Sequence, residues 1–320
     1  MKYVLICSDS ITNIEFIYNW IENIIQTVGK DNIFICMEGS IEENVLNKIK
    51  EKIDIRFYTY KIDYEKYKKK AISVRDFVLS SNNDFLYALW DGKDKSVASL
   101  IIGFLERNKK VDFKIVPVVF SMWNFLFIDI IDAICITTNG YISSKGKAVL
   151  GRGNAFTSRV FIPDIEIKLG NYLKEYGNKV QVLGKYNNKN IINFPVKPGS
   201  VIVNEDKSNI VYYLKDKVDV GDEVGGFLAR ADLNIIKDSC NQLAKLIDEL
   251  HLNYVVLPKP GVGAGELSWS TVKRTILDTD LYNFKDRVII VSATSYKLLS
   301  KFSKKDDFKS YSYKGDKGWI

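Results

Sequence analysis

Histidine is almost absent from this chain of 320 residues, since His251 is the only one. A catalytic pair built on a histidine base, or a metal site with several imidazole ligands, is therefore not expected. His251 follows a predicted helix, where its expected role is to cap the last carbonyl groups.

Cysteine is scarce as well. The four cysteines, Cys7, Cys36, Cys135 and Cys240, are isolated from one another, and three of them lie in apolar runs. This pattern argues against a disulfide framework and against a thiolate metal site. We therefore expect no metal, no cofactor and a cytoplasmic location.

Long hydrophobic runs are missing. The most apolar region, residues 116–136, is interrupted by Pro117, Asn124, Asp129 and Asp132. The uninterrupted apolar runs within it are too short to cross a bilayer, and the apolar run near the N-terminus is shorter than a signal-peptide core. No membrane partner is expected, and residues 116–136 are interpreted as two buried strands and a domain junction.

The formal charge of +7 comes from 46 basic and 39 acidic residues. A nucleic-acid-binding face would explain it, but so would a coding bias towards Lys, Asn and Ile, which we favour. With 46% hydrophobic residues, the chain can bury two cores of ordinary size, so two domains are expected.

The first part of the chain alternates between strand and helix patterns. Strands are predicted at residues 3–8, 32–37, 55–60, 85–89 and 113–118, and helices at 13–28, 41–52 and 97–108. This alternation predicts an α/β fold with a doubly wound parallel sheet.

The second part continues the alternation. Strands are predicted at residues 133–137, 180–183, 191–194, 254–257 and, as the last strand, 287–291, with helices at 159–174, 231–250 and 270–277. Residues 198–230 contain a β-prone run, 210–214, and are interpreted as a hairpin-like insertion that could cover a ligand cleft. Residues 301–320 form a polar tail.

A glycine-rich loop follows the strand at residues 254–257. Gly261, Gly263 and Gly265 remove every second side chain, which leaves backbone amides able to face a ligand. Ser268 or Ser270 can cap the next helix, whose N-terminus also attracts anions. The loop is therefore a candidate phosphate site, although a simple turn has the same pattern.

A second loop has a similar arrangement. The strand at residues 133–137 is followed by Asn139 and Gly140, and then by residues 151–155, Gly-Arg-Gly-Asn-Ala. Two loops that each follow a strand are expected to meet in one ligand cleft.

These segments resemble the macro domain in order and spacing. The resemblance is carried by residues 133–140 (AICITTNG), 150–155 (LGRGNA), 193–197 (NFPVK), 231–233 (ADL) and 257–269 (LPKPGVGAGELSW), and covers about residues 120–293. It implies a three-layer α/β/α domain over residues 119–300 that binds ADP-ribose or a derivative, such as a cyclic NAD-derived nucleotide.

The resemblance also implies roles for single residues. Asn139 would contact the distal ribose, with an Asx turn at the strand end as the alternative role. The diphosphate would lie between the two loops, whose implied ligand-binding residues are Gly140, Gly151, Arg152, Gly153 and Asn154, and Gly261, Val262, Gly263, Ala264, Gly265 and Glu266. The adenine candidates are Asn124, Asp129 and Asp132.

Catalysis is a separate question. One macro-domain branch removes ADP-ribose from protein carboxylates with a lysine and an aspartate, but the aspartate position aligns with Gly265 here. The catalytic candidates are Asn139, Lys185, an approximate match for the lysine, and Glu266. Two hypotheses remain open: a hydrolase acting on an ADP-ribosylated macromolecule or on ADP-ribose 1''-phosphate, and a binding protein that senses or sequesters the nucleotide.

Residues 1–118 resemble the SLOG superfamily of Rossmann-like nucleotide-binding domains. The resemblance is carried by Tyr64, residues 68–71 (KKKA), Arg75-Asp76 and residues 89–96 (LWDGKDKS). It makes Arg75, Trp90, Asp91 and Lys93 candidates for a second ligand site. Domains of both kinds occur in NAD-derived nucleotide signalling, including bacterial and viral immunity.

The phosphate loop of that resemblance is degenerate. After Cys36 the chain has one glycine, Gly39, beside Glu38, Glu42 and Glu43, whose negative charges would repel phosphate. The alternative is that this domain binds no ligand and has a structural role or forms a homo-oligomer.

Overall fold

The computed structural model describes residues 1–302, which form two compact units. Unit 1 spans Met1–Ser121, and unit 2 begins at Met122. The sequence places the boundary slightly earlier, between residues 118 and 119. Each unit has its own sheet.

Unit 1 is a doubly wound α/β domain. Its elements are β1 (Lys2–Cys7), α1 (Ile14–Val28), β2 (Ile33–Met37), α2 (Ile41–Lys50), β3 (Arg56–Tyr60), α3 (Tyr64–Tyr67), α4 (Ala71–Asn82), β4 (Phe85–Trp90), α5 (Lys95–Leu105) and β5 (Lys110–Ile115). All five strands are parallel, in the order β3-β2-β1-β4-β5. The order reverses between β1 and β4, as the doubly wound pattern predicts.

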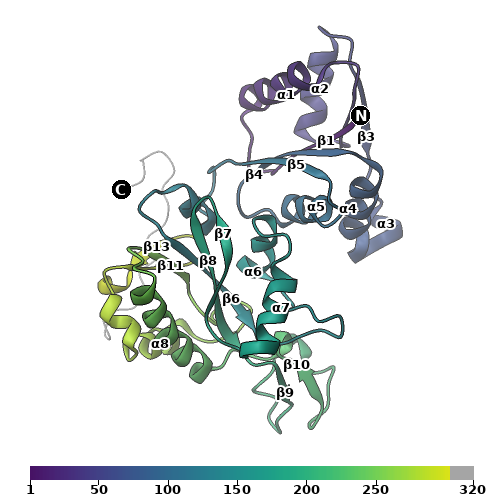
Figure 1. Cartoon of the computed structure of the whole chain (residues 1–320). Helices are drawn as coiled ribbons and strands as arrows, with labels where there is room; N and C mark the ends of the chain where they lie inside the picture. Colours follow the sequence, from purple (N-terminus) through teal and green to yellow (C-terminus); the bar gives the residue numbers. More distant parts are fainter. Residues whose placement is uncertain (303–320) are drawn as a thin grey trace. The chain divides into compact units, whose positions relative to one another are not determined.

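The helices of unit 1 cover both faces of this sheet. Helix α1 buries Ile17, Ile21 and Ile24 at helical spacing, and it packs with α2 against one face (Figure 1). Helices α4 and α5 cover the other face. Helix α4 was not predicted, and β5 begins at Lys110, earlier than the expected strand at 113–118.

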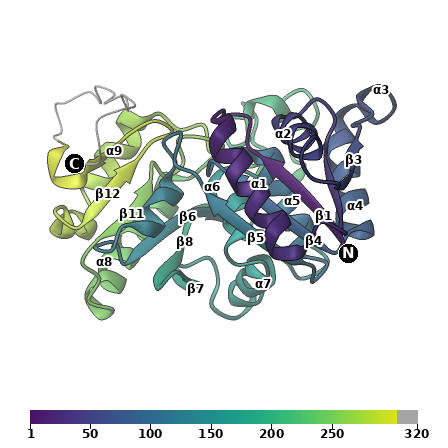
Figure 2. The same ribbon diagram turned by 90° about the horizontal axis from the view of Figure 1, so that it is seen from above.

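Unit 2 has a mixed sheet. Its elements are β6 (Ala133–Asn139), α6 (Gly153–Thr157), α7 (Ile165–Tyr176), β7 (Gln181–Tyr186), β8 (Lys189–Lys197), β9 (Ser200–Ile202), β10 (Glu223–Gly225), α8 (Leu233–Glu249), β11 (Val255–Pro258), α9 (Trp269–Leu277), β12 (Val288–Val291) and β13 (Tyr296–Leu298). Short 3-10 turns are η2 (Met122–Phe127), η4 (Tyr212–Leu214) and η5 (Gly226–Leu228). The strand order is β13-β12-β11-β6-β8-β7. Figure 2 shows the part of this order from β12 to β7.

The four central strands of unit 2, β12, β11, β6 and β8, are parallel, whereas the two edge strands are antiparallel to their neighbours. Helix α8 packs on one face, where Ile236, Cys240 and Leu243 join the core with Cys135. Helices α6 and α7 lie on the other face (Figure 1). The carboxyl ends of the parallel strands therefore share one edge.

Several sequence expectations differ from the structure of unit 2. The expected helix at 159–174 begins only at Ile165, because Pro163 cannot continue a helix from the preceding turn. Residues 210–214 form η4 and a single bridge between Ile210 and Ala229 instead of a strand. Residues 116–132 contain η2 instead of a first buried strand.

The C-terminal part of unit 2 also differs. Strand β13 follows β12, so the segment at 287–291 is not the last strand, and Phe302 is buried in the core. The remainder of the expected polar tail, residues 303–320, lies outside the described residues.

All four cysteines are buried free thiols. In residues 1–302, no helix has the length and apolar character needed to span a membrane. Over the same range, no three His, Cys, Asp or Glu side chains gather in a group suited to a metal ion.

Candidate functional site

The two glycine-containing loops meet at one edge of the unit 2 sheet. Loop 1 (residues 140–153) follows β6, and loop 2 (residues 259–268) follows β11, which pairs with β6 in parallel. Strand β8 lies on the other side of β6 and brings Lys197 opposite Asn139. Three neighbouring strands thus deliver loop 1, loop 2 and Lys197 to the same edge, where open α/β sheets bind ligands.

The three glycines of loop 2 have different roles. A Cβ on Gly261 would lie 2.8 Å from the Ala231 side chain, and one on Gly265 would lie 2.5 Å from the carbonyl oxygen of Gly261. These two glycines are therefore required for packing inside the protein. Gly263 is exposed, has no positive φ and has nothing within 4 Å of an added Cβ.

Loop 2 presents backbone donors. Within the part of the chain that the structure describes, the amides of Gly263 and Ala264 donate no hydrogen bond. Ser268 is the N-cap of α9, since its hydroxyl accepts the amide of Thr271 at 3.2 Å, which settles the choice between Ser268 and Ser270. Amides and a helix N-terminus together favour an anion beside Gly263.

Asn139 shapes loop 1. Its side-chain oxygen accepts the amide of Tyr141 at 3.0 Å, and its side-chain nitrogen donates to the carbonyl of Val149 at 2.9 Å. The side chain is 8% exposed. This is the Asx-turn role, and a ribose contact would use the small part of the amide that remains accessible.

The remaining loop 1 residues divide into packed and exposed ones. A Cβ on Gly140 would lie 2.9 Å from Asn178, and Asn154 donates to the carbonyl of Cys135 at 3.2 Å, so both are packed. Gly151 and Gly153 are exposed, with nothing within 4 Å of an added Cβ. Between them, Arg152 holds its guanidinium carbon 4.7 Å from the ring centre of Tyr213.

Lys197 is the residue at this edge that sequence reasoning did not select. Its side chain is 6% exposed, and its ammonium group donates to the carbonyls of Ala264 at 2.8 Å and Phe227 at 3.3 Å. Burial, with a smaller contribution from Arg152 and against Glu266, lowers the pKa of Lys197 from 10.5 to about 8. The motif at residues 193–197 could have indicated Lys197, but the strand was expected to end at residue 194, which left Lys197 outside it.

Glu266 turns its side chain away from loop 2. Its carboxylate oxygens accept the amide of Tyr212 at 2.9 and 3.2 Å, and its carbonyl accepts Arg230 at 2.8 Å. Its backbone has a φ of 58°. Glu266 therefore joins loop 2 to the segment that precedes α8.

Lys185 does not belong to the site. On β7 it pairs with Asn190, which pairs in turn with Ala133 at the start of β6. Asn139 is at the other end of β6, so about 20 Å of strand separates the two positions. Lys185, the approximate match for the catalytic lysine, therefore lies at the opposite edge of the sheet from the two loops, because β7 runs antiparallel to β8.

The adenine candidates are also divided between the two edges. Asp132 precedes β6 and accepts the amides of Asn253 and Tyr254 at the amino edge, while Asp129 is exposed and uses its carbonyl to accept Lys189 at 3.0 Å. Neither faces the loops.

Asn124 is the candidate that remains. It is 6% exposed and lies in η2, next to Trp123. The indole of Trp123 donates to Thr157, the last residue of α6, at 2.8 Å. Asn124 stays a candidate for the adenine contact.

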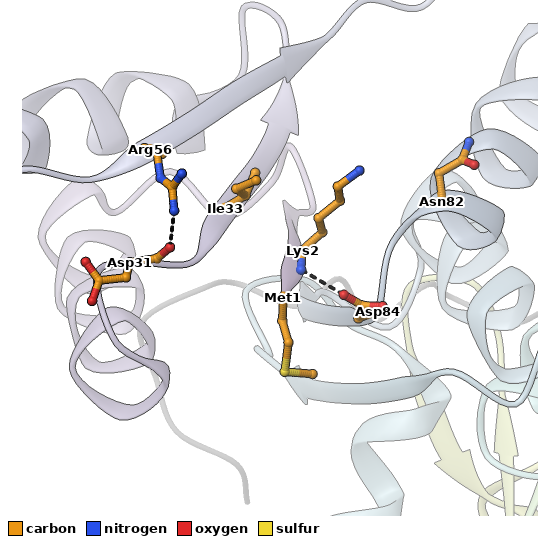
Figure 3. Close-up of a pocket in the computed structure, with 7 residues that line it drawn as sticks. All are labelled: Met1, Lys2, Asp31, Ile33, Arg56, Asn82 and Asp84. Carbon is orange, nitrogen blue, oxygen red and sulfur yellow. Dashed lines mark hydrogen bonds between the residues drawn. The ribbon is translucent and has the colours of Figure 1, made fainter.

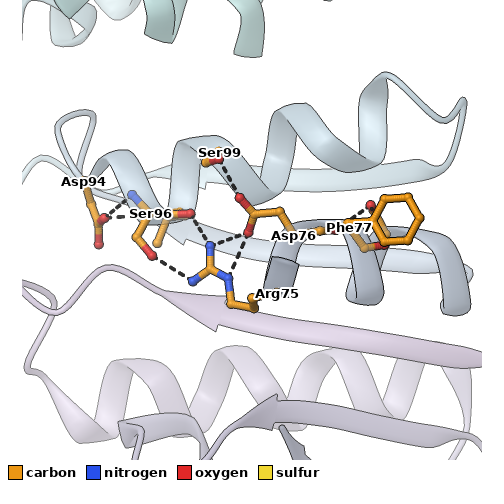
Figure 4. A network of polar contacts seen from close by, with 8 residues as sticks. Arg75, Asp76, Phe77, Asp94, Ser96 and Ser99 are labelled. Carbon is orange, nitrogen blue, oxygen red and sulfur yellow. Dashed lines mark hydrogen bonds and ion pairs between the residues drawn. The ribbon is translucent and has the colours of Figure 1, made fainter. Parts of the chain in front are cut away.

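In unit 1, the second-site candidates make internal contacts. The Arg75 guanidinium is 2% exposed and bonds to Asp76 at 2.5 and 2.8 Å and to Ser96 at 2.7 Å (Figure 4). Trp90 has no exposed surface and donates its indole N–H to the carbonyl of Asp94 at 2.9 Å. A fully buried indole is not available to stack on a base.

Asp91 is likewise used internally. Its carboxylate accepts the Ser10 hydroxyl at 2.8 Å and the Lys93 amide at 2.8 Å, which fixes the turn after β4. The side chain of Lys93 is exposed. Of the second-site candidates, Lys93 is the one that faces solvent.

Carboxylates of unit 1 accept hydrogen bonds from backbone amides at the carboxyl ends of β1 and β2. Glu42 is 2% exposed and accepts the amide of Cys7, and Glu43 accepts the amide of Gly39 at 2.6 Å. Burial raises the pKa of Glu42. These donors are therefore already satisfied by the protein's own side chains.

A pocket of about 360 Å³ lies at the opposite, amino edge of the unit 1 sheet (Figure 3). Its lining includes Lys2, Ile33 and Arg56, which start three neighbouring strands. The Arg56 guanidinium donates to the carbonyl of Asp31 at 2.5 Å. Doubly wound sheets bind ligands at their carboxyl edge, and this pocket lies at the other edge.

Neither a protein-family model nor a curated protein matches this chain. Solved structures are similar to it at low identity. The macrodomain of Mycobacterium tuberculosis DarG is 22% identical, with a TM-score of 0.36 over 52% of this chain and 91% of that one. The macrodomain of Thermus aquaticus DarG is 19% identical, with a TM-score of 0.35 over 53% of this chain and 93% of that one.

A third similar structure is Thermosipho africanus DarTG in complex with ADP-ribose. It is 14% identical, with a TM-score of 0.37, and the match covers 66% of this chain. This chain spans 54% of that longer chain. The α/β assignment of unit 2 rests on its own strand order, and the site rests on its own contacts.

Proposed function

We propose that unit 2 binds ADP-ribose, or an ADP-ribose-derived nucleotide such as a cyclic NAD-derived signal, and acts as a sensor or sequestering protein. The observation that carries this proposal is the set of donors at one sheet edge. Three neighbouring segments carry the amides of Gly263 and Ala264, which donate no hydrogen bond within residues 1–302, the guanidinium of Arg152 and the ammonium group of Lys197.

A diphosphate fits these donors chemically. Its oxygens accept several hydrogen bonds at once, and backbone amides beside a helix N-terminus stabilise its negative charge. The two cations add charge, partly offset by Glu266. The nucleoside end would extend towards Asn124, and the distal ribose towards Asn139.

The direct test is titration of ADP-ribose into the full chain by calorimetry, together with the thermal unfolding midpoint. We expect one site, with a midpoint that rises with ligand concentration because only the folded state binds. AMP and ribose 5-phosphate, which lack the diphosphate, are the matched comparisons and should bind far more weakly. Equal affinity for AMP would place recognition elsewhere.

The alternative function is hydrolysis, either of the bond between ADP-ribose and a macromolecule or of ADP-ribose 1''-phosphate. Lys197 is the observation that favours it. With a pKa of about 8, roughly a quarter of the Lys197 side chains are neutral amines at pH 7.5. A neutral amine can act as a base or as a nucleophile.

Turnover of ADP-ribosylated protein and of ADP-ribose 1''-phosphate separates the two functions. A hydrolase should lose most of its kcat in Lys197→Ala and keep it in Lys185→Ala, the matched lysine at the opposite edge. Binding of ADP-ribose without turnover of either substrate by the parent protein would favour the sensor.

A further inference from the structure

The insertion between β8 and α8, here called the flap (residues 198–230), is a small unit with its own core. Val203, Ile210 and Val224 are buried within it, and β9 pairs with β10. The ammonium group of Lys207 donates to the carbonyls of Lys215 at 2.9 Å and Val218 at 2.7 Å. The flap is therefore built to move as one body.

The two ends of the flap are joined at a narrow point. The amide of Gly226 donates to the carbonyl of Gly199 at 2.7 Å. A Cβ on Gly226 would lie 1.7 Å from the carbonyl oxygen of Pro198, so the strands can approach this closely only because Gly226 has no side chain. The flap is also bonded on both sides of Gly226, since the amide of Val211 donates to Leu228 at 3.0 Å and the amide of Arg230 donates to Asn209 at 2.9 Å.

The turn η4 of the flap touches both ligand loops. The ring of Tyr213 lies 4.7 Å from the Arg152 guanidinium of loop 1. The amide of Tyr212 donates to the Glu266 carboxylate of loop 2 at 2.9 Å. Tyr213 is 39% exposed, and a cation–π contact at such a site is weak enough to open.

We propose that the flap is a lid over the carboxyl edge of the sheet. The Tyr213–Arg152 and Tyr212–Glu266 contacts hold it closed, together with the bonds from Lys197 to Phe227 and from Arg230 to Glu266. The nature of the ligand under this lid rests on the proposed function. The guanidinium that holds Tyr213 in the free protein is also placed to pair with a diphosphate, so ligand entry and opening of this contact are coupled.

Hydrogen exchange of the full-length free protein tests the lid without any ligand. Tyr213→Ala should speed exchange of the flap amides about two- to fivefold, the factor expected from losing one exposed cation–π contact. Tyr213→Phe keeps the ring and should exchange like the parent. Tyr64→Ala, which removes an exposed tyrosine of unit 1, is the control. Unchanged flap exchange in Tyr213→Ala, or faster exchange throughout unit 2, would overturn the lid.

Stopped-flow mixing with ADP-ribose then tests the coupling. Both the association and the dissociation rate should rise about two- to fivefold in Tyr213→Ala relative to Tyr213→Phe. Equal rates in the two variants would overturn the coupling. If the parent protein does not bind ADP-ribose, the proposed function fails, and the hydrogen-exchange result still decides whether the lid exists.

Discussion

The side-chain nitrogen of Lys197 lies 2.8 Å from the carbonyl oxygen of Ala264, at the centre of loop 2. The same ammonium group donates to Phe227 of the flap at 3.3 Å. One buried cation therefore joins strand β8, loop 2 and the flap. Its protonation state should influence both the stability of unit 2 and the chemistry of the site.

The first prediction concerns pH. The pKa of Lys197 in the folded protein, about 8, is below its ordinary value of 10.5, so the unfolded chain binds more protons between these values. The free energy of unfolding contributed by Lys197 should therefore rise with pH across this window, by on the order of 3 kcal/mol. Below pH 8 the full cost of burying the charged form is present.

Denaturant unfolding of the parent protein and of Lys197→Met, from pH 7 to pH 10.5, isolates this effect from the other titrating groups. The difference in unfolding free energy between the two proteins should shift in favour of the parent as the pH rises. A difference that stays constant over the range would contradict the assignment of a lowered pKa to Lys197.

The second prediction separates the adenine candidates. Asp132→Ala leaves the amides of Asn253 and Tyr254 without their acceptor, so it should destabilise the protein by about 1–3 kcal/mol. Because Asp132 lies at the amino edge, the affinity for ADP-ribose of the folded variant should not change. Asn124→Ala should weaken binding, and Asp129→Ala should change neither quantity. Weaker binding by Asp132→Ala with Asn124→Ala unaffected would reverse the placement of adenine.

The third prediction concerns Arg75. Arg75→Ala leaves the Asp76 carboxylate buried without its cation, which should cost about 3–5 kcal/mol of stability. Replacing both residues, as Arg75→Met with Asp76→Leu, should restore part of that loss. Calorimetric titration of the folded double variant should give the parent affinity for ADP-ribose. A large loss of affinity without a loss of stability would make Arg75 a ligand residue.

Much of the fold could be predicted from the sequence because apolar periodicity determines the elements. The α/β class and the doubly wound sheet of unit 1 are confirmed, as shown by buried runs such as β1 and by the helical spacing of Ile17, Ile21 and Ile24. Helix α4 was missed because its apolar positions do not gather on one face and its buried residues include Arg75 and Asp76.

The site was predicted less completely. Loop 1 and loop 2 were each placed after a strand, and these two strands pair in parallel. The sequence could not show that β7 reverses direction, which moves Lys185 to the opposite edge, or that β8 extends to Lys197. The direction of a strand depends on which strand it pairs with, and the local spacing of apolar residues does not determine that pairing. A homo-oligomer formed through unit 1 stays a prediction, which light scattering can check.

The central claim, that loop 2 holds a diphosphate, is tested most directly at Gly263. This residue is exposed, has no positive φ and has open space where a side chain would lie, so substitutions there should leave folding intact. Calorimetric titration of ADP-ribose into Gly263→Ala, Gly263→Gln and Gly263→Glu compares size and charge at one position. We predict a small loss of affinity for Ala, a larger one for Gln, and for Glu a further loss of roughly thirtyfold, about 2 kcal/mol, from charge repulsion. Binding of ADP-ribose to folded Gly263→Glu with the affinity of the parent protein would contradict the account.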